Sequence, residues 1–164
     1  MSIAIITGAS SGIGKELVKQ LSLYVDSVEE IWAIARREEL LLELKKETDI
    51  PVRAIPLDLT DLKSLDALDS LLKTEEKDVS VLVNCAGYGK FGNYGDIKNC
   101  EAMGMIDLNC RALVGITNIT LPFMKSGAKI LQICSLSAFQ PLPLMQNLLQ
   151  SMPIVQQIKT NLLI

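Results

Sequence analysis

Short apolar runs alternate with longer amphipathic segments along most of the chain. The runs are rich in Ile, Val and Leu and almost continuously hydrophobic, which is typical of strands buried on both faces of a sheet. The predicted strands are residues 3–7, 31–35, 52–57, 79–83 and 129–134. Apolar residues at helical spacing separate them. The predicted helices are residues 15–24, 38–48, 62–72 and 100–124, the last of these broken after Leu121 by Pro122.

The repeated strand–helix order predicts an α/β fold of the doubly wound, Rossmann type, built on a parallel sheet. With about five strands and their flanking helices, we expect this sheet to be incomplete. Ligands of such sheets bind at the carboxyl ends of the strands, near the point where the strand order reverses. Functional residues are therefore expected just after the predicted strands.

Composition narrows the classes of function. The chain has 164 residues, which suits one domain, and it contains no histidine. Ser-His-Asp and Cys-His catalysis and His-ligated zinc or haem are therefore excluded. A net charge of -3 and an aromatic content of 4% argue against nucleic acid as a partner.

The four cysteines show no metal-ligand or redox spacing. No CxxC pair occurs among Cys85, Cys100, Cys110 and Cys134. We therefore interpret them as small buried residues in a reducing cytosol. A metal bound by all four is the weaker alternative. No signal-peptide pattern begins the chain, and no apolar run reaches the roughly 20 residues of a membrane span. We expect a cytoplasmic protein with no metal site and no membrane association.

A glycine-rich segment joins the first predicted strand to the first predicted helix. It reads Thr7-Gly8-Ala9-Ser10-Ser11-Gly12-Ile13-Gly14. Glycines permit a tight turn and a close approach of backbone to phosphate, and the positive end of the following helix favours an anion. The position of the segment between strand and helix therefore predicts a pyrophosphate site, with a turn of no function as the alternative.

This segment resembles the N-terminal fingerprint of the classical short-chain dehydrogenases/reductases, and four further motifs follow in the family's order. Asp58, in the sequence LDLT, matches the acid that holds the adenine ring. Asn84-Cys85-Ala86-Gly87 resembles the NNAG element, with Cys in place of the second Asn. Asn109 matches the helix asparagine that organises a water in the proton relay, and Ser135 matches the catalytic serine after the fifth strand.

The resemblance implies an oxidoreductase that transfers hydride between a nicotinamide cofactor and a small carbonyl or alcohol substrate. The catalytic residues that it implies are Ser135 and Asn109. The implied cofactor-binding residues include Thr7, Gly8, Ser10, Ser11, Gly12, Ile13, Gly14, Asp58, Leu59, Asn84, Ala86 and Gly87. Family members often dimerise through the helix that corresponds to residues 100–124, so a homo-oligomer is an open possibility. The loop 88–94 is a candidate for the pocket entrance.

The end of the second predicted strand indicates which cofactor is used. Members that prefer NAD place an acid there, which accepts hydrogen bonds from the ribose 2′-OH. The matching residue is Ala35, and Arg36 and Arg37 follow it. No carboxylate repels a 2′-phosphate here and two guanidinium groups could pair with it, so we predict NADP rather than NAD. The alternative is a solvated charge pair with Glu38 or Glu39.

The family's Tyr-x-x-x-Lys pair has no counterpart at its usual place. That tyrosine exchanges a proton with the substrate, and the lysine's charge lowers the tyrosine's pKa. Thirteen residues after Ser135 stands Leu148, and four residues further stands Met152. The string Tyr94-Gly95-Asp96-Ile97-Lys98 has the right spacing but precedes Asn109 and Ser135, so we interpret it as a coincidence.

Residues 144–164 differ in composition from residues 1–143. Their only charged residue is Lys159, among many Leu, Gln and Asn. We predict an NAD(P)-binding Rossmann-type domain over 1–143 and an aberrant or shortened tail. The tail is either the product of a frameshift or premature stop, or a genuine helix that Pro153 divides. Little or no turnover is expected, and the alternatives to an oxidoreductase are a non-catalytic NADP-binding module and an inactive gene fragment.

Overall fold

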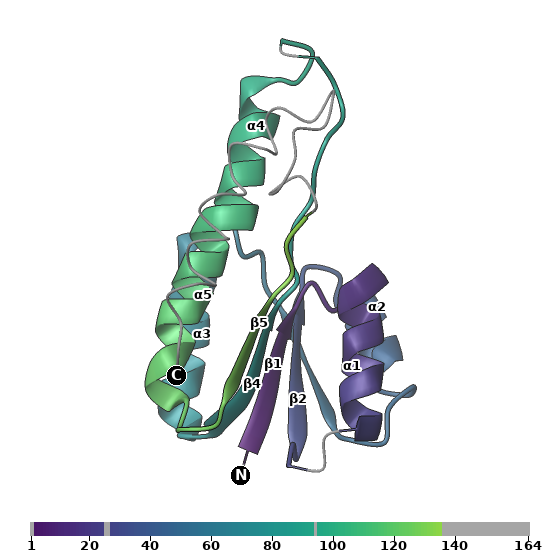
Figure 1. Cartoon of the computed structure of the whole chain (residues 1–164), viewed down its shortest axis with the longest axis vertical. Helices are drawn as coiled ribbons and strands as arrows, with labels where there is room; N and C mark the ends of the chain where they lie inside the picture. Colours follow the sequence, from purple (N-terminus) through teal and green to yellow (C-terminus); the bar gives the residue numbers. More distant parts are fainter. Residues whose placement is uncertain (1, 25–26, 94, 136–164) are drawn as a thin grey trace.

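Five parallel strands form one sheet in the order β3-β2-β1-β4-β5 (Figure 1). The computed structural model describes residues 2–24, 27–93 and 95–135. The strands are β1 (Ser2–Thr7), β2 (Glu30–Ala35), β3 (Val52–Pro56), β4 (Asp78–Asn84) and β5 (Lys129–Gln132). Because the order reverses between β1 and β4, the predicted doubly wound α/β fold is confirmed.

Helices cover both faces of this sheet. The helices α1 (Gly12–Tyr24) and α2 (Glu38–Leu44) lie on one face, and α3 (Leu62–Glu75) and α5 (Leu113–Thr120) lie on the other (Figure 1). Successive residues of β1 alternate between the two cores: Ile5 packs with Leu68 of α3, whereas Ile6 packs with Val18 of α1. Both faces of the central strands are therefore buried, as their continuous apolar runs predicted.

The helix predicted over residues 100–124 is one helical stretch of four parts. These are α4 (Asn99–Ile106), the π-helical segment η1 (Asp107–Ala112), α5, and the 3-10 turn η2 (Leu121–Phe123). Pro122 lies within η2, and α5 ends before it at Thr120. In Figure 1, α4 stands well beyond the carboxyl ends of the strands. The homo-oligomer through this stretch stays a prediction.

Two helix ends show how the chain enters and leaves its helices. Asp61 caps α3, because its side chain accepts a hydrogen bond from the backbone N–H of Lys63 at 3.0 Å. By contrast, α2 ends at Leu44 rather than at residue 48. The backbone N–H groups of Lys46 and Glu47 bond to carbonyl oxygens three residues earlier, at 3.0 Å each, so the chain leaves the helix through tight turns.

The cysteines differ in burial. Cys110 is buried, Cys85 and Cys134 are half-buried, and Cys100 is exposed. The expectation of four buried cysteines is therefore wrong for Cys100, which stands in the first turn of α4.

Several predictions fall outside the described residues. They concern the tail 144–164, with Leu148 and Met152, and Tyr94 of the Tyr94–Lys98 string. Within the described ranges, no helix is long and apolar enough to cross a membrane. The same part of the chain contains no group of three metal-ligating side chains.

Candidate functional site

A cavity of about 870 Å³ opens at the carboxyl ends of the strands, next to the reversal of strand order. Segments that follow all five strands contribute to its lining. The predicted residues that line it are Gly8, Ser10, Ser11, Gly12, Ile13, Gly14, Arg36, Arg37, Asp58, Leu59, Ala86, Gly87, Asn109 and Ser135. The fold thus brings together motifs that are far apart in the sequence.

Two predicted residues, Thr7 and Asn84, do not line this cavity but lie beneath it. Thr7 is buried at the end of β1, and its Oγ1 accepts hydrogen bonds from the backbone N–H groups of Cys85 and Ala86, at 3.0 Å each. Asn84 is buried at the end of β4, and its Nδ2 donates to Oγ1 of Thr117 at 3.1 Å. Both side chains therefore join elements that surround the cavity floor.

The glycine-rich turn between β1 and α1 allows backbone segments to approach closely. Gly8 has a φ of +69°, and a Cβ on it would lie 2.8 Å from the backbone nitrogen of Ala86. A Cβ on Gly14 would lie only 2.3 Å from the carbonyl oxygen of Gly8. The first turn of α1 therefore packs directly on the turn, and its N-terminal N–H groups lie at the cavity wall.

Arg37 lies across this turn from the end of β2. Its Nη2 donates hydrogen bonds to the hydroxyl oxygens of Ser10, at 3.0 Å, and Ser11, at 2.8 Å. Glu38 and Glu39, which begin α2, form no ion pair with Arg37 in the described part of the chain. The hydrogen-bond partners of the guanidinium are thus the two neutral hydroxyls of the glycine-rich turn, at the wall of the cavity.

Asp58 follows β3, and its carboxylate is held by its neighbour. Oδ1 accepts hydrogen bonds from the hydroxyl of Thr60, at 2.7 Å, and from its backbone N–H, at 3.0 Å. These bonds, aided by the charge of Arg36, hold the pKa of Asp58 below its ordinary value. Asp58 is therefore an anion near neutral pH, and Oδ2 is left for a donor within the cavity.

Asn109 lies in η1 and holds the loop that follows β4. Its Oδ1 accepts a hydrogen bond from the backbone N–H of Tyr88 at 3.0 Å, and its Nδ2 donates to the backbone oxygen of Tyr88 at 2.9 Å. Gly87 permits this contact, since a Cβ there would lie 3.0 Å from Oδ1 of Asn109. Of the candidate entrance loop 88–94, Tyr88 and Gly89 line the cavity, whereas residues 90–93 do not and residue 94 lies outside the described residues.

Further residues complete the lining. Ser135 contributes to it just after β5. Cys85, which replaces an Asn of the NNAG element, also lines the cavity, and burial raises the pKa of its thiol. Thr60 and Asp107 line it too, although sequence reasoning gave them no role. No signal in the apolar pattern distinguishes a polar residue that faces a cavity from one that faces solvent.

The family model described as short chain dehydrogenase matches residues 2–147. This chain belongs to that family. Its fold and cavity are therefore those of an NAD(P)-binding oxidoreductase family. Most residues of the sequence motifs that resemble this family lie in the loops that line the cavity.

Two curated proteins similar to this short-chain dehydrogenase chain come from Schizosaccharomyces pombe and Chromohalobacter salexigens. The NADP-dependent 3-hydroxy acid dehydrogenase of Schizosaccharomyces pombe is 34% identical over 140 residues, which cover 81% of this chain and 53% of that protein. Sulfoacetaldehyde reductase 2 of Chromohalobacter salexigens is 31% identical over 166 residues, covering 98% and 65% respectively. The chain thus spans about half to two thirds of the length of these relatives.

Solved structures of the family superimpose closely. A short-chain dehydrogenase from Sphingobium yanoikuyae in complex with NADPH has a TM-score of 0.84 at 26% identity, covering 99% of this chain and 64% of that one. A bulky-bulky ketone specific alcohol dehydrogenase from Comamonas testosteroni has a TM-score of 0.84 at 25% identity, covering 99% and 66%.

Proposed function

We propose that this short-chain dehydrogenase chain binds NADP(H) and belongs to an enzyme that transfers hydride between NADP(H) and a carbonyl or alcohol substrate. The observation that carries the proposal is the contact between Arg37 and the two serines of the glycine-rich turn. The contact lies beside the turn that we propose binds the pyrophosphate, and among the described residues Arg37 forms no ion pair with a carboxylate. The other lining residues are consistent with a dinucleotide.

The pyrophosphate would lie on the glycine-rich turn. Gly8 and Gly14 allow the turn to pack closely on neighbouring backbone, because a Cβ on either would meet backbone atoms. The N–H groups of the first turn of α1, together with the positive end of the helix, favour an anion at this place. Asp58, at the edge of the cavity that follows β3, would accept a hydrogen bond from the adenine amino group through Oδ2.

NADP rather than NAD is favoured by charge. A guanidinium can make two parallel hydrogen bonds to a phosphate, and Arg37 stands at the position that reads the ribose 2′ substituent. Ala35 supplies no carboxylate there that could repel the phosphate or bind a 2′-OH. The names of the S. pombe relative and of the S. yanoikuyae complex include NADP and NADPH, which agrees with this preference.

For the reaction, bound nicotinamide supplies or accepts the hydride. Ser135, just after β5, would donate a hydrogen bond to the substrate oxygen and orient the reacting carbon. Asn109 would hold the loop after β4 in place through Tyr88. Its role towards a relay water stays a prediction, since its amide oxygen and nitrogen are both bonded to that backbone.

A non-catalytic NADP-binding module is the second candidate. Leu148 and Met152 stand where the family has its tyrosine and lysine, so these 164 residues offer no proton donor at that position. Loss of a general acid costs roughly 10²–10⁴ in rate. We therefore propose that the chain by itself binds NADP(H) with little or no turnover.

An experiment that measures binding and turnover together distinguishes the enzyme from the non-catalytic module. The purified 164-residue chain is titrated with NADPH, and NADPH oxidation is then followed with aldehydes and ketones of graded size. Binding without oxidation supports the module. Steady oxidation would show a competent enzyme and overturn the proposed loss of turnover, whereas absence of binding by the folded chain would overturn the proposed function itself.

A further inference from the structure

The π-helical segment η1 contacts two separate loops of the cavity. Through Asn109 it holds the loop after β4, as described above. On its other side, Nη2 of Arg111 donates a hydrogen bond to the backbone oxygen of Thr60 at 2.7 Å. Thr60 belongs to the connection of residues 57–61, which we call the β3–α3 loop. Residues two apart on a helix do not share a face, which is why η1 can reach both loops.

Arg111 is oriented for this contact by its own helix. Asp107, one turn earlier, forms an ion pair with it at 3.3 Å. Asp107 lines the cavity, whereas Arg111 is not part of the lining. The guanidinium therefore reaches the loop from outside the cavity, so its effect on a bound ligand must pass through the loop.

The β3–α3 loop has internal bonds, but these do not connect it to η1. Asp58 accepts its two bonds from Thr60, and the backbone N–H of Asp61 donates to the backbone oxygen of Asp58 at 3.0 Å. The first half of the loop is held elsewhere: the backbone N–H of Leu57 donates to the backbone oxygen of Ala35 at 3.1 Å, and Leu59 is buried in the core. The bond from Arg111 links Thr60, in the second half of the loop, to η1.

We propose that Arg111 is a positioning residue for the adenine end of the cofactor, because it holds the β3–α3 loop against η1 with Asp58 facing the cavity. This inference rests on the proposed function, which assigns the adenine to Asp58. The positive charge of Arg111 also strengthens the bond to the carbonyl oxygen of Thr60 relative to a neutral donor. One irregular helical segment thereby positions two of the loops that line the cavity.

Hydrogen exchange on the ligand-free chain tests the loop-holding step. In R111M the backbone amides of Thr60 and Asp61 should exchange faster, because the loop has lost its link to η1. R111K keeps a cation, so the exchange rates of these amides should lie between those of wild type and those of R111M. K73M is the matched control, since it removes another i,i+4 ion pair, Lys73 with Asp69, from α3. Faster exchange at Leu68 as well would indicate general destabilisation and would overturn the proposal.

Affinity for adenosine 2′,5′-bisphosphate tests the consequence for binding. We expect its Kd to rise about five- to tenfold in R111M, to recover in part in R111K and to stay unchanged in K73M. A Kd in R111M within twofold of wild type, or unchanged exchange at Thr60, would overturn the inference. If the wild-type chain fails to bind this probe, the proposed function fails, and the exchange result alone decides whether Arg111 holds the loop.

Discussion

At the residue scale, the cavity is shaped by side chains whose polar atoms are bonded to the backbone of neighbouring loops. Oγ1 of Thr7 accepts two N–H bonds from the chain after β4, and the amide of Asn109 satisfies both backbone groups of Tyr88. The charged guanidinium of Arg111 likewise donates a hydrogen bond to the backbone oxygen of Thr60. The loops are thus held before a ligand arrives, which lowers the entropy lost on binding.

Arg37→Met tests the proposed preference for the 2′-phosphate. The variant should bind NADP about tenfold more weakly and NAD as before, because only NADP offers a phosphate to the guanidinium. Calorimetric titrations with both nucleotides measure the difference. Lys125→Met, which removes a remote and exposed cation, is the control. An equal loss for NADP and NAD would contradict a role at the 2′-phosphate.

Gly14→Ala tests the packing of α1 on the glycine-rich turn. The new Cβ would lie 2.3 Å from the backbone oxygen of Gly8, so the helix must shift, at a cost of about 1–3 kcal/mol in the free energy of unfolding. Nucleotide binding should weaken as well. Gly115→Ala is the control, because its Cβ would meet only the flexible end of Leu65. Urea unfolding compares the two, and equal stability would argue against tight backbone packing.

Motif order located most of the residues at the cavity, because each motif follows a strand and parallel strands end at one edge. It could not show that Thr7 and Asn84 point beneath the cavity, or that Arg111 bonds to Thr60. Those contacts join positions that are distant in the chain. They depend on how neighbouring strands and helices are placed in space.

At the scale of elements, periodicity predicted the strands and the α-helical stretches of the described part, although several ends differ. The β-branched runs and the leucine spacing are strong signals. The end of α2 at Leu44 was missed because the following tight turns use residues that also suit a helix. The π-helical segment η1 was missed because one additional residue in a turn leaves the apolar spacing almost unchanged.

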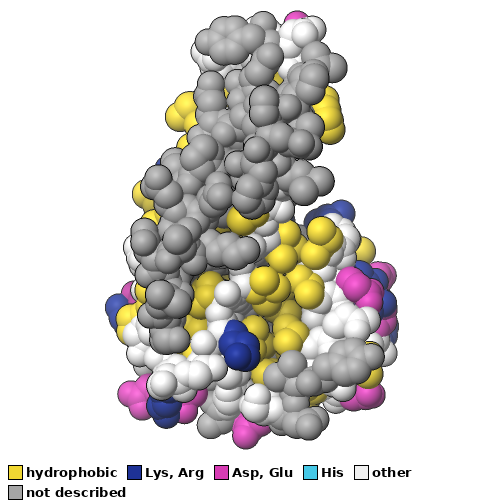
Figure 2. Space-filling view, viewed as in Figure 1, with side chains coloured by type: hydrophobic (Ala, Val, Ile, Leu, Met, Phe, Trp, Pro, Cys, Tyr) yellow, Lys and Arg dark blue, Asp and Glu magenta, His cyan; other side chains and the backbone are white. Residues whose placement is uncertain are grey.

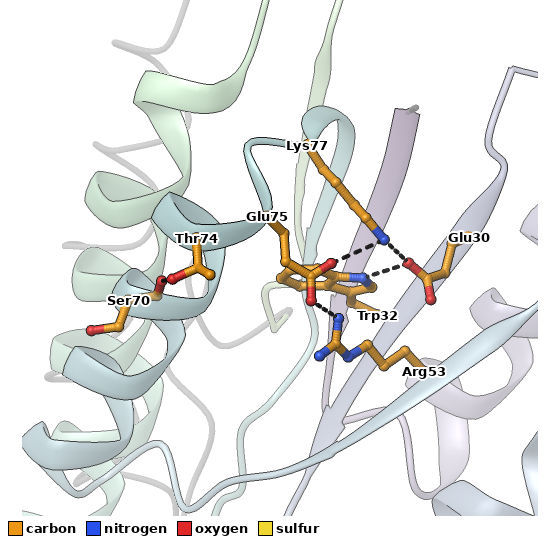
Figure 3. Close-up of polar contacts among 7 residues, drawn as sticks. All are labelled: Glu30, Trp32, Arg53, Ser70, Thr74, Glu75 and Lys77. Atoms are coloured by element: carbon orange, nitrogen blue, oxygen red, sulfur yellow. Dashed lines mark hydrogen bonds and ion pairs between the residues drawn. The ribbon is translucent and has the colours of Figure 1, made fainter.

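A charged cluster joins β2, β3 and α3 around the single tryptophan (Figure 3). Trp32 is buried, and its Nε1 donates to Oε2 of Glu30 at 3.0 Å. The cations of Arg53 and Lys77 lie 5.1 and 5.7 Å from the centre of its ring. Lys77 also pairs with Glu30 and Glu75, at 2.5 and 3.2 Å. The cluster covers the indole at the edge of the core.

Lys77→Met should lower the free energy of unfolding by about 1–2 kcal/mol, because it removes a cation–π contact and leaves Glu30 with less compensation. Partial burial opposes ionisation of Glu30, but the hydrogen bonds from Lys77 and Trp32 outweigh it and hold the pKa of Glu30 below its ordinary value. The fluorescence of Trp32 in urea measures the unfolding transition directly. Unchanged stability relative to the Lys125→Met control would contradict this account.

Glu47 links the turn after α2 to α1 and predicts a pH dependence. Its carboxylate accepts hydrogen bonds from Lys15, at 2.8 Å, and from Lys19, which lower the pKa of Glu47 to about 2. Because the folded-state pKa is depressed, this contribution to stability is present above the ordinary pKa of 4.5 and is lost as pH falls towards 2.

Glu47→Gln should therefore flatten the dependence of unfolding free energy on pH within that window. Urea unfolding of wild type and variant at several pH values provides the comparison. An NMR titration of the Glu47 carboxyl carbon gives the pKa itself. A midpoint near 4.5 in the folded chain would show that the two lysines do not hold the carboxylate.

At the scale of the whole molecule, the charges at the cavity are unevenly placed. Arg36 and Arg37 line it at the end of β2, beside the positive end of α1, whereas Asp58 and Asp107 line it elsewhere, and the net charge of the chain is -3. Figure 2 shows hydrophobic side chains at the surface of this face. Leu131 of the outer strand β5 is one of the exposed large hydrophobic residues of the described chain. The positive charge is confined to the arginine end of the cavity, and this favours one small anionic group there over a polyanion.

The central claim is that the chain binds NADP, and calorimetric titration of the 164-residue chain with NADP tests it most directly. The buried emission of Trp32 first confirms that the chain is folded. We predict saturable binding at one site per chain, about tenfold tighter than the binding of NAD under the same conditions. No saturable heat with NADP from the folded chain would contradict the account.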